Sequence, residues 1–502
     1  MAKPRNPESF PAKKTTQSGQ SGVPPRSPFA GKTSKTAPQS PEKRTAVAPA
    51  RVPVRKPLQT PAQSSQKPSK PVPARSDFAS RPAANVPFGA VISRRASDRI
   101  RQGHLWVYAT DIESVSAPNA ETLLPVADNR GLLLGTALYS PASQITLRLI
   151  ARDAVTLPQW LDLLAARLRT AVQRRKHLLD EQTDACRLVY SEADNLPGLV
   201  VDKYAGVVVV QLLAKGLDTP ETRAVCARVL SEELAGPLTI WERPDPRIRE
   251  LEGLSAPSIT ALFASDPNAP QSGTIFRLNG LSFHFDANSG QKTGAFLDQR
   301  ENYAAAASWA KSSGVQKALD VCTYQGGFAL HLARVCQQVT GIDASRASLE
   351  VAERNLAVNQ ENAGAPGLAS ETWEAKVDWI EADAFELLRA WSDSPEHKDW
   401  DMIVLDPPAF AKSKRAVEGA LRGYKELNLR ALKMIRPGGL LVTCSCSHHV
   451  SWTDLEGAVA SAALDANRRV TLLERRGAAP DHPVVLNLSE TEYLKCLICQ
   501  VE

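Results

Sequence analysis

Short apolar runs separated by turn-forming residues fill residues 88–150. The runs cover residues 89–92, 106–108, 131–139 and 145–150, and each is short enough to form a single strand. Turn-forming residues stand between the runs, where the chain is expected to reverse direction. This pattern predicts a small β-barrel within residues 87–155.

A mixed pattern follows over residues 156–272. Residues 158–182 are rich in leucine, alanine and arginine and predict a helix, and a second helix is expected over 219–234. Strands are expected at 187–190, 199–213 and 238–242, which together predict a small α+β domain. The segment 273–287 then holds two strand candidates around Asn279-Gly280, a strong signal for a two-residue hairpin turn.

Strands and helices alternate over residues 288–502. Strand candidates stand at 317–322, 338–343, 377–381, 402–405 and 439–443, and Ser345 is placed to cap the helix that follows the second of them. This alternation predicts a doubly wound, mostly parallel sheet. Two late runs, 469–473 and 493–501, have no helix between them and predict an antiparallel pair at one edge of that sheet.

Composition sets residues 1–86 apart from the rest of the chain. The 502 residues carry a net charge of +6, and residues 1–85 alone hold 16 Lys and Arg against 3 acidic residues, together with 16 of the 36 prolines. A basic, proline-rich segment has too little apolar surface to fold by itself, so we expect a disordered tail that either solubilises the protein or binds phosphates weakly. The remaining residues are net acidic.

The sequence also excludes several classes of protein. No run of 18 apolar residues predicts a membrane span, and because Met1-Ala-Lys-Pro-Arg5 leads into polar residues, we expect no secretory signal. Eight cysteines in 502 residues do not form a disulfide scaffold. We therefore expect a cytoplasmic protein that does not contact a membrane.

Acidic residues follow the strands of the predicted parallel sheet. They are Asp320, Asp343, Asp383 and Asp406, and the loop after Asp320 reads Thr323-Tyr-Gln-Gly-Gly-Phe328. In open α/β sheets a ligand binds beyond these strand ends. Four carboxylates suit the amine, ribose and adenine donors of S-adenosylmethionine (SAM), whereas they would repel a pyrophosphate. Each Asp alone could be a helix cap, but together they favour SAM over NAD.

The eight cysteines differ in their surroundings. Cys186, Cys226, Cys322 and Cys336 lie in apolar runs and are expected to be buried, and no cysteine pair has the spacing of a zinc site. The Cys496/Cys499 pair lies in a predicted strand with its side chains on opposite faces, so we expect it to be structural. After the fifth strand, Cys444 and Cys446 share a face. Cys446 reaches further into the crevice, where a thiolate could act as a nucleophile.

The chain from about residue 88 resembles the bacterial large-subunit rRNA cytosine-C5 methyltransferases that carry an N-terminal PUA domain. The strings that carry the resemblance include Phe296-Leu-Asp-Gln-Arg300, Tyr324-Gln-Gly-Gly-Phe328, Asp406-Pro-Pro-Ala-Phe410, Ser445-Cys-Ser447 and Glu492-Tyr-Leu-Lys495. The resemblance implies a PUA domain (87–155), a small α+β domain, a hairpin linker (273–287) and a class I methyltransferase domain (288–502). It also implies 23S rRNA, free or in the assembling large subunit, as the substrate.

The resemblance also implies roles for individual residues. Cys446 would attack C6 of the cytosine, and Asp406 would hydrogen-bond the base. The cofactor would lie with its methionine part against Asp320, its ribose on Asp343 and its adenine near Asp383. The loop residues Thr323, Tyr324, Gly326, Gly327 and Phe328 would complete the cofactor site, and no metal is implied. The chain departs from the family in having Cys444 and in residues 488–492, and the base that removes the C5 proton is not identified.

RNA contacts are expected at two places. Lys292, Gln299 and Arg300 should lie beside the crevice, and Arg99 and Trp106 belong to a basic and aromatic cluster near the start of the folded part. An arginine cluster is equally often a solvated surface. Two other functions stay open: an rRNA base N-methyltransferase, which needs no nucleophilic cysteine, and a non-catalytic rRNA assembly factor. The protein could act as a homodimer.

Overall fold

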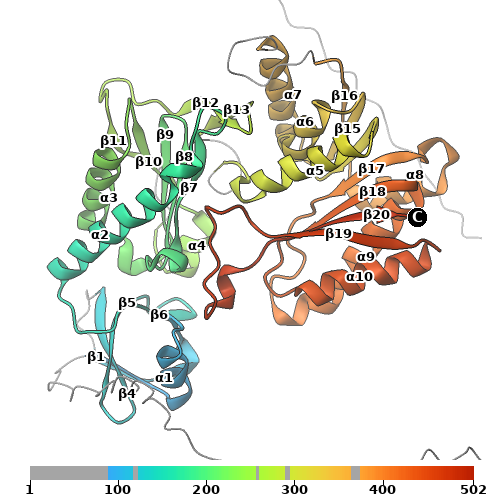
Figure 1. Ribbon diagram of the computed structural model, residues 1–502. Helices are drawn as coiled ribbons and strands as arrows, with labels where there is room; N and C mark the ends of the chain where they lie inside the picture. The colour runs from blue at the N-terminus through green and yellow to red at the C-terminus, as the bar shows by residue number, and fades with distance from the viewer. Residues whose placement is uncertain (1–88, 117–121, 256–258, 289–293, 363–372) are drawn as a thin grey trace, which may run out of the picture. The chain divides into compact units, whose positions relative to one another are not determined.

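The computed structural model describes residues 89–116, 122–255, 259–288, 294–362 and 373–502. The proline-rich tail and Lys292 lie outside these residues. The described chain forms three separate sheets and a two-stranded hairpin (Figure 1). No helix among the described residues is both long enough and apolar enough to span a bilayer.

The first sheet has six strands in the order β2-β6-β5-β4-β1-β3. The expected strands form as β1 (Gly89–Ile92), β2 (Trp106–Tyr108), β5 (Leu133–Tyr139) and β6 (Ile145–Ala151). Two strands were not expected, namely β3 (Ile112–Ser116) and β4 (Leu123–Asp128). Helix α1 (Arg94–Arg101) was not expected either, and its Ala96 and Ile100 are fully buried in the core of this sheet.

The second sheet has five strands in the order β11-β10-β9-β8-β7. The strands are β7 (Ala185–Tyr190), β8 (Leu199–Tyr204), β9 (Val207–Leu212), β10 (Thr239–Glu242) and β11 (Thr260–Ala264), and the helices are α2 (Leu157–Arg175), α3 (Pro220–Glu233) and α4 (Pro246–Leu251). Two expectations need correction. The first helix ends at Arg175 rather than at 182, and the run 199–213 is two strands because the chain reverses at Ala205 and Gly206.

Strands β12 (Gly273–Leu278) and β13 (Leu281–Asp286) form the expected hairpin. Asn279 and Gly280 have φ values of 53° and 79°, the left-handed conformation that a two-residue hairpin turn requires. The hairpin is fastened to helix α7 (Arg346–Glu361) by side chains of that helix. Asn359 Oδ1 accepts from the Ser282 N–H at 2.8 Å, and Asn355 Oδ1 accepts from the His284 N–H at 2.8 Å.

The third sheet has seven strands in the order β16-β15-β14-β17-β18-β20-β19 and confirms the doubly wound prediction. Strands β14 to β18 are parallel, whereas β20 runs antiparallel to both β18 and β19, as the late apolar runs predicted. Their bounds are β14 (Lys317–Val321), β15 (Gln338–Asp343), β16 (Lys376–Glu381), β17 (Trp400–Leu405), β18 (Ile435–Ser445), β19 (Val470–Arg476) and β20 (Lys495–Val501).

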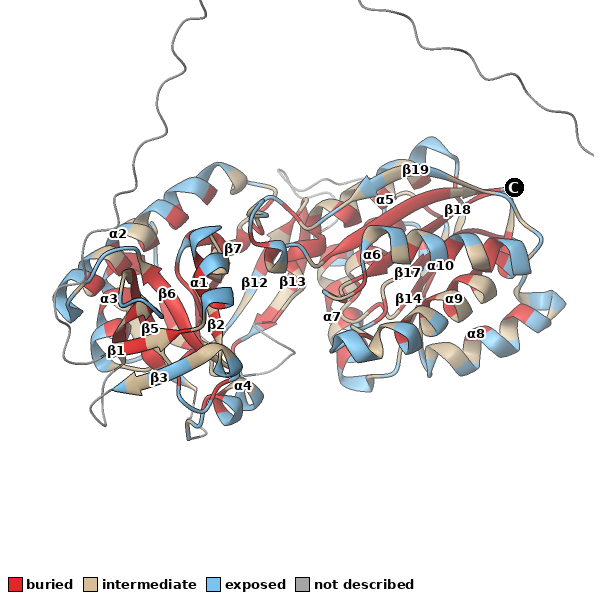
Figure 2. Ribbon diagram, turned by 90° about the horizontal axis from the view of Figure 1, so that it is seen from below, coloured by how far each residue is buried: buried red, intermediate tan, exposed pale blue. Residues whose placement is uncertain are grey.

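Helices cover both faces of this sheet, and buried residues fill the space between the sheet and the helices on each face (Figure 2). Residues of α5 (Arg300–Ser312) and α6 (Gly327–Ala333) pack on one face, and residues of α8 (Ala384–Asp393), α9 (Val417–Met434) and α10 (Trp452–Asp465) pack on the other. Cys496 belongs to the first core and Cys499 to the second, which confirms that their side chains point to opposite faces.

Candidate active site

A cavity of about 540 Å³ opens beyond the carboxyl ends of the parallel strands. The residues that follow β14, β15, β16, β17 and β18 all contribute to its wall, which is where ligands bind in open α/β sheets. The lining includes Phe296, Asp298, Gln299, Tyr303, Cys322, Thr323, Tyr324, Gln325, Gly327, Phe328, Asp343, Asp383, Phe385, Asp406, Pro407, Phe410, Cys446 and Tyr493.

Asp320 fixes the loop after β14 by accepting hydrogen bonds from its residues. This carboxylate is fully buried, and its Oδ2 accepts from the Thr323 hydroxyl at 2.5 Å and from the Ala329 N–H at 2.9 Å. Its other oxygen has no hydrogen-bond partner among the described residues. Burial raises the pKa of Asp320 to about 7. Asp320 does not line the cavity, so it shapes the loop 322–328 rather than forming the cavity surface.

Backbone geometry brings that loop into the cavity. Cys322 and Tyr324 have φ values of 65° and 52°, and Gly326, with φ 87°, is the N-cap of α6. A Cβ at Gly327 would come within 2.5 Å of the Tyr303 ring, so only glycine fits there. Of the five loop residues predicted to bind the cofactor, Thr323, Tyr324, Gly327 and Phe328 line the cavity, and Gly326 is not part of the lining.

Two of the expected acids stand on the rim beside this loop. Asp343 ends β15, and its two oxygens accept from the Tyr324 N–H and the Ser345 N–H, each at 2.9 Å. Asp383 caps α8 by accepting from the Phe385 N–H at 2.9 Å and from the Glu386 N–H at 3.0 Å. Each carboxylate therefore has a fixed orientation and keeps lone pairs for further donors.

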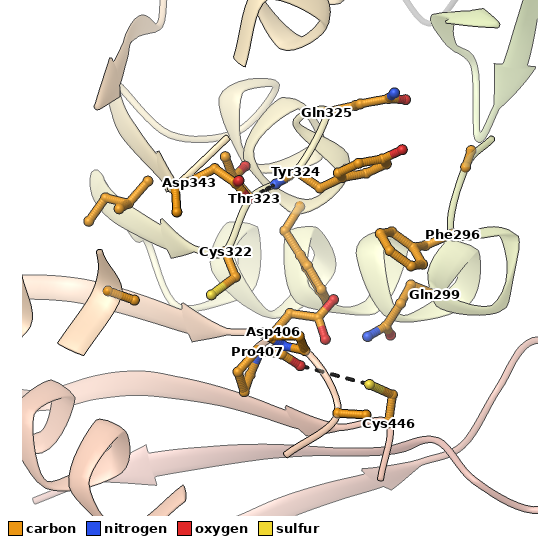
Figure 3. Close-up of a pocket in the computed structure, with 18 of the residues that line it drawn as sticks. Phe296, Gln299, Cys322, Thr323, Tyr324, Gln325, Asp343, Asp406, Pro407 and Cys446 are labelled. Atoms are coloured by element: carbon orange, nitrogen blue, oxygen red, sulfur yellow. Dashed lines mark hydrogen bonds between the residues drawn. The ribbon is translucent and has the colours of Figure 1, made fainter. Parts of the chain in front are cut away.

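Cys446 and Asp406 lie at the other side of the cavity (Figure 3). The Cys446 sulfur is half-buried and stands 3.8 Å from the Pro407 carbonyl oxygen. The loop that carries it is fixed by its neighbours. The Ser445 hydroxyl donates to Tyr424 Oη at 2.8 Å, and Ser447 Oγ accepts from the Ala411 N–H at 3.1 Å.

Among the remaining cysteines, the prediction for Cys322 needs correction and the others do not. Cys444 is fully buried beside Cys496 in the core, so it does not share the exposure of Cys446. Cys186, Cys226 and Cys336 are buried as expected. Cys322 was expected to be a buried core residue, but it is half-buried and lines the cavity, because its left-handed backbone turns the side chain out of the strand. Figure 3 shows its sulfur beside the cavity.

The expected RNA contacts near the crevice need correction. Arg300 is 2% exposed, and its guanidinium donates to the Ala185 carbonyl at 3.3 Å and lies 3.5 Å from Asp481 Oδ2. It belongs to the interior and is not presented at the crevice. Gln299 is also 2% exposed, but it forms part of the cavity wall near Asp406 (Figure 3). Lys292 lies outside the described residues.

Arg99 and Trp106 lie in the first sheet and its helix, away from the cavity lining. The guanidinium of Arg99 pairs with Asp111 at 2.5 Å, and the Trp106 indole N–H donates to Glu192 Oε1 at 2.9 Å. Both side chains therefore already have polar partners within the fold. The structure brings neither of them to the cavity.

The lining residues that received no role from the sequence include a hydrogen-bonded polar pair. Asp298 and Tyr493 both face the cavity, and the Tyr493 hydroxyl donates to Asp298 Oδ2. They lie in strings that carry the family resemblance, Phe296-Leu-Asp-Gln-Arg300 and Glu492-Tyr-Leu-Lys495. A contact between residues so far apart along the chain leaves no local pattern, so membership of those strings was the one available signal.

Comparison with known proteins identifies the family. A family model described as S-adenosylmethionine-dependent methyltransferase matches residues 192–492, and a PUA-like domain model matches residues 91–152. The chain belongs to this methyltransferase family. A ribosomal RNA large subunit methyltransferase I of Shewanella frigidimarina is 36% identical over 406 residues, which cover 80% of this chain and 96% of that protein. The corresponding protein of Shewanella denitrificans is 37% identical with the same coverage.

The fold of the methyltransferase is also found among solved structures. A SAM-dependent methyltransferase from Streptococcus mutans aligns with a TM-score of 0.66 at 18% identity, covering 82% of this chain and 99% of that one. The cavity suits SAM, because Asp343 and Asp383 offer oriented acceptors at successive strand ends and the glycine-containing loop leaves space beside them. The protein is therefore a SAM-dependent methyltransferase with a PUA-like domain.

Proposed function

We propose that this methyltransferase transfers a methyl group to C5 of a cytosine in 23S rRNA through a covalent adduct with Cys446. The observation that carries the proposal is the half-buried Cys446 sulfur in the same cavity as Asp406 and the loop 322–328, which is proposed to hold the cofactor. The rRNA substrate is inferred from the names of the relatives and from the PUA-like domain, and we expect the reaction to occur in the cytoplasm. Either free 23S rRNA or the assembling large subunit is the acceptor.

The cofactor site is proposed to follow the acids of the rim. The ribose hydroxyls would donate to Asp343, the adenine would lie near Asp383, and the methionine part would lie against Thr323, Tyr324 and Gly327. Asp320 would not contact the cofactor but would position Thr323 by accepting a hydrogen bond from its hydroxyl. When bound, the cofactor supplies an electrophilic methyl group on a sulfonium.

The chemistry follows from the low nucleophilicity of cytosine C5. The Cys446 thiolate forms a bond from sulfur to C6, and the C5–C6 double bond becomes an enamine whose C5 carries electron density. As the C6–S bond forms, negative charge develops at N3, and Asp406 in its protonated form stabilises it by donating a hydrogen bond to N3; as a carboxylate it accepts from the exocyclic amine and orients the base. After C5 has gained the methyl group, a base removes the C5 proton, the double bond forms again and the C6–S bond breaks. The target base must leave its stack to reach the sulfur.

Replacing Cys446 by alanine tests this proposal. The acceptor is 23S rRNA from a strain lacking the protein, and the readouts are methyl incorporation and mass mapping of the modified nucleotide. We expect Cys446→Ala to lose essentially all turnover while still binding SAM. Cys226→Ala, which removes a buried sulfur of the second sheet's core, is the matched control and should keep its activity. RNA containing 5-fluorocytosine should trap the wild-type protein as a covalent complex.

The two other functions give different outcomes. A base N-methyltransferase would keep most of its turnover in Cys446→Ala and would form no trapped complex. An assembly factor would show no SAM binding in isothermal titration at millimolar ligand. The oriented acids at the strand ends favour the catalytic function over the assembly factor.

A further inference from the structure

Lys495 carries a buried ammonium group beside the loop that holds Cys446. Lys495 is 3% exposed and is the first residue of β20, where its backbone pairs with that of Ser445 in β18. Its Nζ donates to the Ser447 carbonyl at 3.1 Å and to the Tyr493 carbonyl at 3.0 Å. The side chain thus reaches along the segment 445–447, which has Cys446 at its centre.

Among the residues that the structure describes, this buried cation has no carboxylate partner. No carboxylate of the described part of the chain lies within ion-pair distance of Lys495 Nζ, which donates instead to two carbonyl oxygens. Burying an ammonium costs several kcal/mol unless a negative charge compensates it. Burial lowers the pKa of Lys495, and the negative charges of Glu492, Cys446 and Asp454 oppose that effect.

The two carboxylates whose charges act on Lys495 already accept hydrogen bonds from other groups. Glu492 accepts from the Trp452 indole at 2.9 Å, and Asp454 accepts from the Ser451 hydroxyl at 2.7 Å. His448 does not supply a competing cation, because burial lowers its pKa and the neighbouring His449 and Lys495 lower it further. Cys446 is therefore the one group among these that both borders the catalytic cavity and can acquire a negative charge beside Lys495.

The surroundings of Cys446 otherwise oppose its ionisation. Asp406 shares its part of the cavity, and Tyr424 interacts with both groups. The other titratable groups on the wall are Asp298, Tyr303, Cys322, Tyr324, Asp343, Asp383 and Tyr493, which supply no positive charge. A partly buried thiol close to carboxylates has a raised pKa unless a cation also lies close to it.

We propose that the Lys495 ammonium is the counter-charge that holds the Cys446 sulfur as a thiolate before the RNA arrives. The thiol proton goes to solvent, and the resulting ion pair of ammonium and thiolate replaces a lone buried cation. Lys495 touches neither substrate nor cofactor in this arrangement, so it is a positioning residue. The inference rests on the proposed role of Cys446 as the nucleophile.

The test is the pH dependence of Cys446 alkylation by iodoacetamide, measured on the full-length protein by peptide mass spectrometry. An ordinary cysteine has a pKa of about 8.5, and we expect the wild-type midpoint to lie below it. Lys495→Met keeps the length of the side chain but removes its charge, so its midpoint should rise by at least one pH unit, with roughly tenfold slower alkylation at neutral pH. Lys495→Arg keeps the charge and should restore most of the shift.

Lys425→Met is the matched control, because Lys425 lies on α9 and pairs with Asp465 at 2.7 Å, away from the cavity lining. It should leave the Cys446 midpoint unchanged. An unchanged midpoint in folded Lys495→Met overturns the proposal. If that variant does not fold, the wild type decides: a Cys446 midpoint at or above the pKa of an ordinary cysteine also overturns the proposal.

Alkylation needs neither RNA nor SAM, so this result is independent of the proposed function. A Cys446→Ala variant that kept its turnover would refute the C5 mechanism without changing the alkylation profile of the wild type. Conversely, an unshifted midpoint in Lys495→Met would leave the covalent mechanism standing and remove only the role of Lys495.

Discussion

The buried carboxyl of Asp320 accepts a hydrogen bond from the Thr323 hydroxyl, with 2.5 Å between the two oxygens, and this contact fixes the loop that forms one wall of the cavity. The arrangement has an energetic consequence, because the carboxyl loses its hydration while one of its oxygens gains no hydrogen bond within the described residues. The loop is thus held by a group that resists ionisation.

The first prediction concerns the pH dependence of stability. Burial raises the pKa of Asp320 to about 7, above the value of about 3.9 in an unfolded chain. The folded state holds this proton more tightly, so the contribution of Asp320 is fully present below about pH 4 and is lost as the pH rises through about 7. Asp320→Asn cannot ionise and keeps an acceptor for Thr323. Between those pH values, urea unfolding should show wild type losing more stability than the variant, and parallel curves would contradict the prediction.

The second prediction concerns Gly327. A Cβ at this position would come within 2.5 Å of the Tyr303 ring, which is buried against Phe328. Gly327→Ala should therefore lower the free energy of unfolding by about 1–3 kcal/mol, the usual cost of overpacking, and should weaken SAM binding. Gly457→Ala is the control, since Gly457 lies in α10 with open space around its Cβ position. That variant should be as stable as wild type or more so, by up to about 1 kcal/mol.

The third prediction concerns cofactor binding at Asp343. Its carboxylate orients the Tyr324 and Ser345 N–H groups and faces the cavity. Hydrogen bonds to a charged group contribute about 1.5–3 kcal/mol, so Asp343→Ala should raise the dissociation constant for SAM by at least about tenfold in isothermal titration. Asp378→Ala on β16 removes a surface carboxylate that pairs with Lys376 and should leave the constant unchanged. Equal affinities in the two variants would argue against a ribose contact.

The fourth prediction concerns the interior position of Arg300. Burial alone would raise the pKa of Asp481, but His482, Arg300 and the Arg187 N–H outweigh it and lower the pKa to about 2. The stabilisation that ionised Asp481 gains from these partners is present above the unfolded pKa of about 3.9 and is lost as the pH falls towards 2. Arg300→Leu leaves Asp481 buried beside fewer cations and should cost about 3–5 kcal/mol in denaturant unfolding. Loss of RNA affinity without loss of stability would restore Arg300 as an RNA contact.

The sequence predicted most of the catalytic sheet because its strands are continuous apolar runs followed by polar residues. The strand ends at Asp343 and Asp406 carried enough information to locate the cavity. The Asn279-Gly280 turn was predictable for a local reason, since both residues tolerate the left-handed conformation that the hairpin needs. These features depend on neighbours in the chain.

Features that depend on distant contacts were not predictable in the same way. Helix α1 was missed because it buries only Ala96, Ser97 and Ile100 among charged residues, which is too weak an apolar pattern. Arg300 was predicted at the crevice together with its neighbour Gln299. In the structure it is buried, because it lies against Asp481, which comes from a remote segment of the chain. Cys322 was assigned to the core because its left-handed backbone cannot be inferred from an apolar run.

The position of β20 inside the sheet also bears on how the enzyme is made. β20 is paired on both sides, with β18 and with β19, and Lys495 begins it. While a ribosome synthesises the chain, β18 and β19 emerge first and each exposes an open hydrogen-bonding edge until β20 arrives to fill the gap. Nascent molecules should therefore be most prone to aggregation, and most dependent on chaperones, in the interval between the synthesis of β19 and that of β20.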